Sequence, residues 1–252
     1  MDFIDTKEKF ESLSAGGCDY EYERWFKTAL SRAAYEMVKN YLERVVIPFS
    51  LPFKSYFELG PGPATWTEMF IRKNSDAYYN LLDISENMIK LAKARLKSYK
   101  NVNYFVSDIK DFETGSKYDF IFSSRAIEYV ADKNLLAAKL ANMLKPGGKG
   151  AIITKMPHYK RAFIRGRKMS ELHGGQISPS ALKAVLEKQG LKIERVDVVT
   201  VNFPLLKSVI LNKALAGIFS GRRLNFVSGF FAESYGIIFI KPNPIYTVNL
   251  GK

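Results

Sequence analysis

The sequence has very little cysteine, since Cys18 is the only one among its 252 residues. A single cysteine excludes an internal disulfide and any cysteine-rich zinc or iron–sulfur site, and we expect no metal site. No stretch reaches the roughly 18 consecutive apolar residues that a membrane-spanning helix needs. The first residues, MDFIDTKEKF, also lack the continuous apolar core of a secretory signal. These absences favour a cytoplasmic protein.

Acidic residues are scarce in the last part of the chain. Residues 151–252 hold 16 basic and 5 acidic groups, a balance of +11, whereas residues 1–150 hold 22 and 20, a balance of +2. Such an excess attracts phosphate, nucleic acid or an acidic membrane surface. We therefore keep open a peripheral contact with the inner face of an anionic membrane and a contact with RNA. The plainer alternative is a basic surface without a partner.

The apolar pattern predicts an α/β fold within a single domain, residues 1–252. Residues 20–47 have helical spacing and predict an N-terminal helical cap over residues 1–50, with its helices ending before Pro48. Short apolar strands then alternate with amphipathic helices, the form typical of a mostly parallel sheet. The strands are expected at 55–59, 78–82, 102–106, 118–122, 149–154, 193–201 and 234–241.

Two helix ends carry glycine signals. A helix over 134–144 should stop at Lys145–Gly148, where a glycine would supply a left-handed cap. A later helix should open at Ser178 with Pro179 in its first turn, and Gly190 should close it.

Glycines and carboxylates follow successive predicted strands. Gly60 and Gly62 come directly after the first strand, where they let the backbone turn sharply and approach a ligand. Asp83 ends the second strand and can accept the hydroxyls of a ribose, while Asp108 ends the third. Because strand ends of this kind meet at one edge of a sheet, we predict an adenosine site there.

The same turn argues against a dinucleotide. The third glycine of a dinucleotide motif is replaced by Thr65, and Glu58 precedes the turn. A carboxylate at this place would repel a pyrophosphate but could lie near the ammonium of an amino acid. The sequence therefore favours adenosine attached to a cationic amino acid.

These motifs resemble class I S-adenosylmethionine-dependent methyltransferases, notably the small-molecule, quinone and lipid-type members. ELGPGPA is similar to the family's E/D-x-G-x-G-x-G turn, with Ala64 where a glycine is usual, and LLDIS, VSDI, YDFIFSSRAIEYV and LKPGGKGAII are similar to its later motifs. The resemblance implies a cofactor-binding core over residues 55–241. Its fold would be a Rossmann-like seven-stranded, mostly parallel sheet with helices on both faces and an antiparallel last strand.

By this resemblance the cofactor is S-adenosyl-L-methionine and the product is S-adenosyl-L-homocysteine. Asp83 would bind the ribose, Asp108 and Ile109 would border the adenine, and Ser124 would lie near the sulfonium. The full set of implied cofactor contacts is Glu58, Gly60, Pro61, Gly62, Asp83, Ile84, Asp108, Ile109 and Ser124.

The methyl acceptor is less well marked. The N/D-P-P-Y/F turn of nucleic-acid amino-methylating relatives is absent, because Ser123-Ser124-Arg125-Ala126 stands there, and Cys18 is poorly placed for cytosine-C5 chemistry. The catalytic candidates are Tyr129, His158 and His173. The substrate-binding candidates are Arg125, Tyr159, Arg161 and Arg165. For each of these, an ordinary core or surface role is the plainer alternative.

The segment 203–232 is strongly apolar with basic residues spaced through it. Such a segment has to be covered by the protein's own core, a partner subunit or lipid, and we predict that it covers the acceptor site. We expect in-line transfer of a methyl group to oxygen, carbon or nitrogen of a small or lipophilic acceptor. The alternatives are an RNA methyltransferase and a non-catalytic protein that binds the cofactor or a membrane.

Overall fold

The computed structural model describes residues 7–8, 10–12, 20–157, 175–202 and 209–244. Within them, seven strands form one sheet in the order β3-β2-β1-β4-β5-β7-β6. Only β7 runs antiparallel to its neighbours, so the expected α/β sheet is confirmed. The strands are β1 (Ser55–Leu59), β2 (Tyr78–Asp83), β3 (Val102–Val106), β4 (Tyr118–Ser124), β5 (Leu144–Lys155), β6 (Lys192–Val201) and β7 (Ala232–Ile240).

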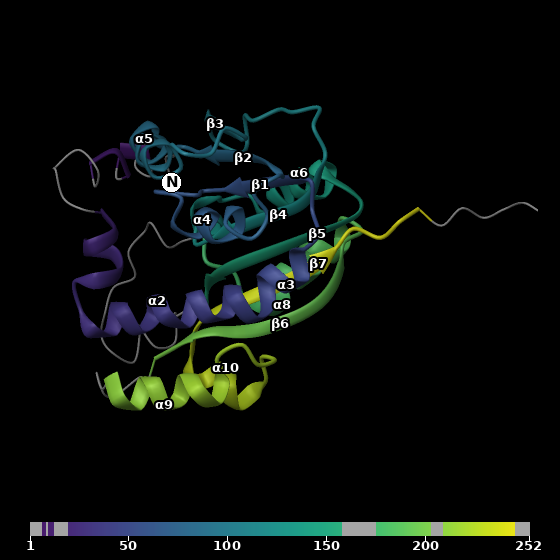
Figure 1. Ribbon diagram of the computed structural model, residues 1–252. Coiled ribbons are helices and arrows are strands. Elements are labelled where there is room, and N and C mark those ends of the chain that lie inside the picture. The colour runs from purple at the N-terminus through teal and green to yellow at the C-terminus, as the bar shows by residue number, and fades with distance from the viewer. Residues whose placement is uncertain (1–6, 9, 13–19, 158–174, 203–208, 245–252) are drawn as a thin grey trace, which may run out of the picture.

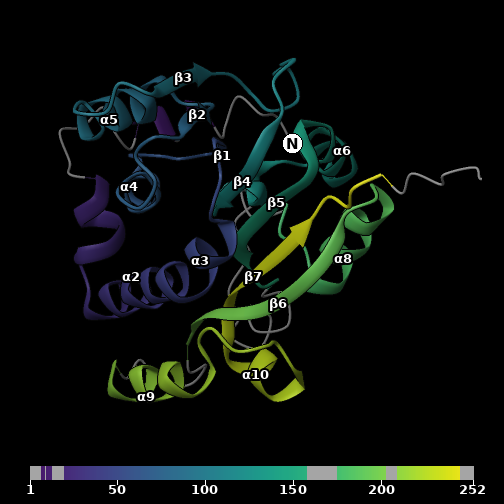
Figure 2. The same ribbon diagram turned by 45° about the vertical axis from the view of Figure 1, so that its right-hand side comes forward.

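Helices cover both faces of the sheet (Figures 1 and 2). One face packs against α2 (Ala29–Tyr41), α3 (Ile47–Ser50), α4 (Thr65–Ile71) and α5 (Glu86–Arg95). The other packs against α6 (Lys133–Met143) and α8 (Pro179–Lys188). Beyond β6 lie α9 (Val209–Phe219) and α10 (Phe226–Phe231), at the lower end of the molecule in Figure 1.

Successive side chains of the central strands point alternately into the two hydrophobic cores, one on each face of the sheet. In β4, Phe120 and Phe122 join the core under α4, whereas Ile121 joins the core under α6. All three are fully buried. This explains the continuous apolar runs, because a parallel sheet is covered on both faces.

The N-terminal helix does not end before Pro48, so that prediction is wrong. π-helical turns (Tyr22–Phe26 and Leu42–Val46) flank α2, and α3 continues the helix to Ser50. Pro48 lies in the first turn of α3, directly after the π-helical turn Leu42–Val46.

The predicted glycine cap of α6 is also wrong. The helix ends in an extended residue, Leu144 (φ −78°, ψ 137°), and β5 begins at that residue. Gly147 does adopt a φ of +73°, but it lies within β5, where its N–H donates to the Lys241 carbonyl at 2.8 Å. The caps of α8 are confirmed, since the Ser178 hydroxyl accepts from the Ala181 N–H and Gly190 has a φ of +76°.

A missing side chain lets the N-terminal helix reach the sheet. The Tyr41 hydroxyl of α2 donates to Asp197 Oδ2 of β6 at 3.0 Å, and both residues are buried. Gly236 of β7 pairs with Asp197, and a Cβ at Gly236 would lie 2.5 Å from the Tyr41 hydroxyl oxygen. The cap therefore depends on glycine at this position.

Gly236→Ala should lower the free energy of unfolding by about 1–3 kcal/mol, because the new methyl group overlaps the Tyr41 ring. The matched control is Gly217→Ala in α9, where a Cβ would meet no atom within 4 Å. Replacing a helix-interior glycine there should raise the free energy of unfolding by about 0.5–1 kcal/mol. Urea unfolding of both variants tests this, and a Gly236→Ala protein as stable as the parent would contradict it.

Candidate functional site

A left-handed turn connects β1 to α4. Gly60, Gly62 and Ala64 have φ values of +67°, +55° and +60°. A Cβ at Gly60 would lie 2.2 Å from the Cβ of Ala126, whereas one at Gly62 would meet nothing within 4 Å. Gly60 is thus required for packing, and Gly62 faces open space. Ala64, the departure from the family's glycine, holds its conformation at a steric cost of about 1–2 kcal/mol.

Asp83 joins the end of β2 to this turn. Its Oδ2 accepts from the Gly62 N–H at 3.0 Å, and its Oδ1 accepts from the Ser85 N–H at 3.0 Å. The side chain is only 7% exposed. Burial raises the pKa of Asp83 to about 6, although the backbone hydrogen bonds from Ser85 and Gly62 act to lower it. The carboxylate is therefore ionised at neutral pH at a cost in desolvation.

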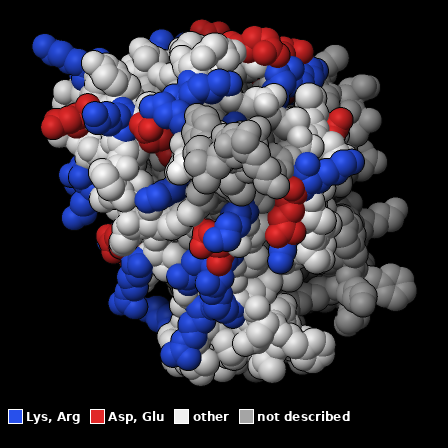
Figure 3. All heavy atoms as spheres, turned by 90° about the vertical axis from the view of Figure 1, so that its right-hand side faces the viewer, with Lys and Arg blue, Asp and Glu red and all other residues white. Residues whose placement is uncertain are grey.

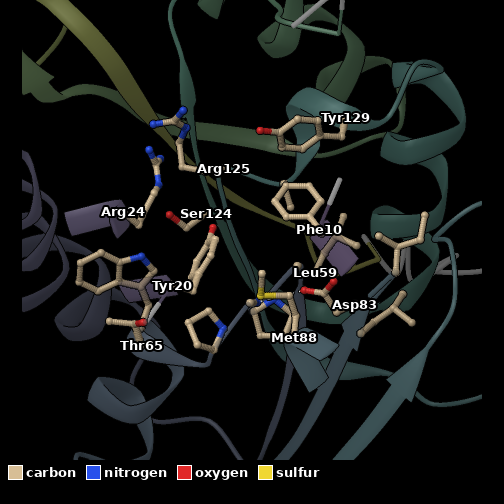
Figure 4. A pocket seen from close by; sticks show the side chains of 18 of the residues that line it. Phe10, Tyr20, Arg24, Leu59, Thr65, Asp83, Met88, Ser124, Arg125 and Tyr129 are labelled. Carbon is tan, nitrogen blue, oxygen red and sulfur yellow. Dashed lines mark hydrogen bonds between the residues drawn. The ribbon is translucent and has the colours of Figure 1, made fainter. Parts of the chain in front are cut away.

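The turn and Asp83 line a cavity of about 780 Å³. It opens at the carboxyl ends of β1 and β4, where the order of the strands reverses, and parallel α/β sheets bind ligands at such a point. Its volume is in the range of small-molecule sites. Figure 4 shows Asp83 and Met88 at one end of it. The predicted cofactor residues that line it are Gly60, Pro61, Gly62, Asp83, Ile84, Asp108, Ile109 and Ser124.

Glu58 lies behind the turn and not in the cavity wall. Its Oε2 accepts from the Tyr56 and Thr67 hydroxyls, each at 2.7 Å, and the side chain is buried. Burial raises the pKa of Glu58 to about 7, against the two hydrogen bonds. The geometry links Glu58 to the first turn of α4, and its supporting role toward a cofactor stays a prediction.

Two buried polar atoms of the predicted cofactor residues that line the cavity lack hydrogen-bond partners. Among the described residues, the buried Asp108 Oδ2 and Ser124 Oγ have no hydrogen-bond partner. Lys110 Nζ approaches Asp108 Oδ2 only to 3.7 Å, which is too long for a hydrogen bond. A buried polar atom left unpaired costs about 1–3 kcal/mol. Both atoms are therefore suited to bind a polar ligand.

The N-terminal cap supplies a second wall that the sequence analysis did not assign. Arg95 holds the cap against the turn, since it pairs with Glu21 and Glu68 and its Nε donates to the Pro63 carbonyl at 2.8 Å. The helical spacing around Trp25 predicted the cap, but no local pattern places it over a turn so far along the chain. The cap residues that line the cavity are Phe10, Ser12, Tyr20, Glu23, Arg24 and Trp25.

Two of the acceptor-side candidates, Arg125 and Tyr129, also line the cavity. Arg125 Nε donates to Glu128 Oε1 at 2.5 Å. Burial acts to raise the pKa of Glu128, but the charge and hydrogen bond of Arg125 hold it below its ordinary value. Burial raises the pKa of the Tyr129 hydroxyl, so that it stays protonated at neutral pH. The other candidates, His158, Tyr159, Arg161, Arg165 and His173, lie outside the described residues.

No group of three or more His, Cys, Asp or Glu side chains in the described part of the chain could hold a metal ion.

Comparisons with known proteins point to one family. A family model described as a methyltransferase domain matches residues 57–149. The chain is similar to two proteins of Ilyobacter polytropus. Malonyl-[acyl-carrier protein] O-methyltransferase 2 is 36% identical over 91 residues, which cover 36% of this chain and 35% of that protein. Malonyl-[acyl-carrier protein] O-methyltransferase 1 is 32% identical over 157 residues, which cover 61% of this chain and 54% of that protein. The matched part thus spans about half or less of these relatives.

The fold likeness extends further along the chain. The N-methyltransferase NodS from Bradyrhizobium japonicum WM9, in complex with S-adenosyl-L-homocysteine, aligns with a TM-score of 0.64 at 14% identity, over 94% of this chain and 99% of NodS. Magnesium protoporphyrin IX methyltransferase from Synechocystis aligns with a TM-score of 0.63 at 12% identity, over 96% and 100%. At such identities the likeness supports the fold.

Asp83→Asn should change the pH dependence of stability. Because the pKa of Asp83 is raised on folding, its ionised form destabilises the folded protein above pH 6, and this penalty disappears as the pH falls toward 4. The unfolding free energy of the variant minus that of the parent should rise by about 1–3 kcal/mol as the pH is raised from 4.5 to 7.5. Urea unfolding at several pH values measures this difference, and a pH-independent difference would contradict the assignment.

Proposed function

We propose that this chain, which contains a class I S-adenosylmethionine-dependent methyltransferase domain, transfers a methyl group to oxygen, carbon or nitrogen of a small or lipophilic acceptor. S-adenosyl-L-methionine supplies an activated methyl group on a sulfonium. The observation that carries the proposal is the cavity at the ends of β1 and β4, with the turn and carboxylates on one side and Arg125 and Tyr129 on another.

The residues present fit this cofactor. Asp83 would accept the hydroxyls of the ribose, and Asp108, through its unpartnered Oδ2, would hold the adenine amino group beside Ile109. The turn at Gly60 and Gly62 would face the amino-acid part. The unpartnered Ser124 Oγ and the open space in front of Gly62 support this arrangement.

Tyr129 would orient the acceptor. Its ring packs edge-to-face on Phe10 with 5.2 Å between ring centroids, and its hydroxyl is protonated at neutral pH because burial raises its pKa. It is suited to donate a hydrogen bond and not to remove a proton. His158 and His173 remain the candidate bases. Enzymes of this kind act mainly by aligning the acceptor and excluding water.

Two of the relatives are named for an acyl-carrier-linked malonyl acceptor, and another, from Nitrobacter winogradskyi, is a ubiquinone biosynthesis O-methyltransferase. These names favour a small-molecule acceptor. They lend no support to an RNA acceptor or to a non-catalytic binding protein.

Asp83→Asn should weaken binding of S-adenosylhomocysteine at least tenfold, because a charged acceptor of two hydroxyls is worth about 1.5–3 kcal/mol. Asp111→Asn is the matched control, since that side chain is 69% exposed and does not line the cavity. Calorimetry measures the affinity, and equal affinity of the parent and Asp83→Asn would refute the ribose assignment. Turnover is tested with the protein, methyl-labelled S-adenosylmethionine and an extract of the source cells. Label that partitions into organic solvent identifies a lipophilic acceptor. The absence of any label transfer would contradict the proposed methyltransferase activity.

We further propose that α9 and α10 contact an anionic membrane. Their most exposed apolar side chains are Ile210 (83%), Phe226 (96%) and Phe230 (61%). Residues 209–232 contain Lys213, Arg222 and Arg223 and no acidic residue, and the lower end of the molecule in Figure 3 shows basic and neutral side chains only. Helices of this kind lie well at anionic lipid surfaces. Within the described ranges, no helix is long and apolar enough to cross a bilayer.

The double variant Ile210→Ser, Phe226→Ser should sediment at least fivefold less with phosphatidylcholine vesicles containing phosphatidylglycerol, because it loses apolar area at the contact. The control is Tyr78→Ser, which removes a side chain 68% exposed on β2. Equal sedimentation of the parent with neutral and anionic vesicles, or of the parent and the double variant, would refute the contact.

A further inference from the structure

A second, smaller cavity adjoins the first. Its volume is about 170 Å³, and it shares four wall residues, Arg24, Trp25, Arg125 and Lys155, with the large cavity. The rest of its wall comes from α2, Ile153 of β5, β6 with the following Asn202, the start of β7, and Asn212 of α9. None of these other residues lines the large cavity, so the two spaces meet only at the four shared residues. Among the described residues of the segment 203–232, only Asn212 lines either cavity. A role of this segment in covering the acceptor site stays a prediction.

Three cations gather at the junction. Figure 4 shows the side chains of Arg24 and Arg125 at the end of the cavity far from Asp83. Burial lowers the pKa of Arg24, and the charge of Arg125 lowers it further. Burial and the same arginine also lower the pKa of Lys155. Three like charges in a partly dehydrated space repel one another, which an anion would relieve.

The neighbouring carboxylates leave the junction with one positive charge. Glu128 is fully buried behind Arg125 and also accepts from the Lys155 N–H at 3.0 Å, so it neutralises one cation. Glu233 lines the second cavity and acts on Lys155 and Arg125. Two carboxylates beside three basic groups leave a formal excess of one positive charge. This balance suits a monoanion such as a carboxylate better than a dianionic phosphate.

We propose that Arg24, Arg125 and Lys155 bind a carboxylate of the methyl acceptor at the junction of the two cavities. The inference rests on the proposed function, whose substrate class it narrows to small acids. A cavity of about 170 Å³ is below the range for a whole drug-sized ligand, so it takes only the acidic end of the acceptor. The remainder of the acceptor lies in the large cavity, toward Ser124 and Tyr129.

The position of the junction favours the acceptor over the cofactor as the source of this carboxylate. In the proposed function, Asp83 and Asp108 would hold the adenosine at the other end of the large cavity. The polar side chains of the second cavity, such as Ser31, Asn202 and Asn212, would contact no part of an adenosine held there. A cofactor carboxylate is nevertheless the competing occupant, because it has the same chemistry.

The test uses calorimetry on the full chain saturated with S-adenosylhomocysteine. Acetate, hexanoate and benzoate are titrated, each beside its neutral amide. At least one carboxylate should bind tenfold or more tightly than its amide, and Lys155→Met should abolish that preference, because methionine keeps the apolar stem and removes the charge. Lys192→Met is the control: it removes the same charge from a site on β6 that is 70% exposed and lines neither cavity.

The variants also separate the two sources. Arg24→Gln and Lys155→Met should leave the affinity for S-adenosylhomocysteine within threefold of the parent. If both variants weaken S-adenosylhomocysteine but not 5′-methylthioadenosine, which lacks the amino-acid carboxylate, the cations serve the cofactor and the inference is overturned. Binding of S-adenosylhomocysteine with no preference for any carboxylate overturns the inference alone. A parent protein that does not bind S-adenosylhomocysteine overturns the proposed function as well.

Discussion

The close contact between Gly60 and Ala126 is the constraint on which the site depends. With no side chain at Gly60, the ends of β1 and β4 approach until a Cβ would lie 2.2 Å from that of Ala126. The turn that follows then points its backbone at the end of β2, and the Gly62 N–H meets the Asp83 carboxylate at 3.0 Å. Three strands and one helix are thereby fixed around the same point, and the cavity is the space that remains above them.

The cavity is electrically divided along its length. Asp83 at the end of β2 and Asp108 just after β3 lie on one side, whereas Arg24, Arg125 and Lys155 meet on the other. Each group is partly dehydrated, and this is why the pKa of Asp83 is raised while those of Arg24 and Lys155 are lowered. Such a site is destabilised in its free state and recovers that free energy only from ligands of matching charge. Selectivity for the ligand and its orientation then have the same origin.

Local patterns made the sheet and the turn side of the cavity wall predictable. Gly60, Gly62, Asp83 and Asp108 each lie at the end of a strand or shortly after it, so a sequence pattern that marks the strand also marks the residue. The cap residues and Lys155 could not be found in this way, because their place over the cavity depends on contacts between distant segments. Arg95 to Glu21, for example, spans 74 positions. The predictions at Pro48 and Gly147 failed because local preference alone did not decide the structure. The helix continues through Pro48 as α3, and Gly147 takes its left-handed conformation within β5 and not as a helix cap.

Arg125 lines the cavity in a strained backbone conformation. It holds a φ of +63°, a conformation that costs a non-glycine residue about 1–2 kcal/mol. Its N–H donates to the Ile153 carbonyl of β5 at 2.8 Å, and its guanidinium is paired with the buried Glu128. Backbone and side chain are thus fixed independently. Strain that the surroundings enforce at the wall of a cavity is typical of residues held in place for a ligand. The pair with Glu128 gives Arg125 a defined position, and Arg24 and Lys155 supply the net charge that attracts an anion to it.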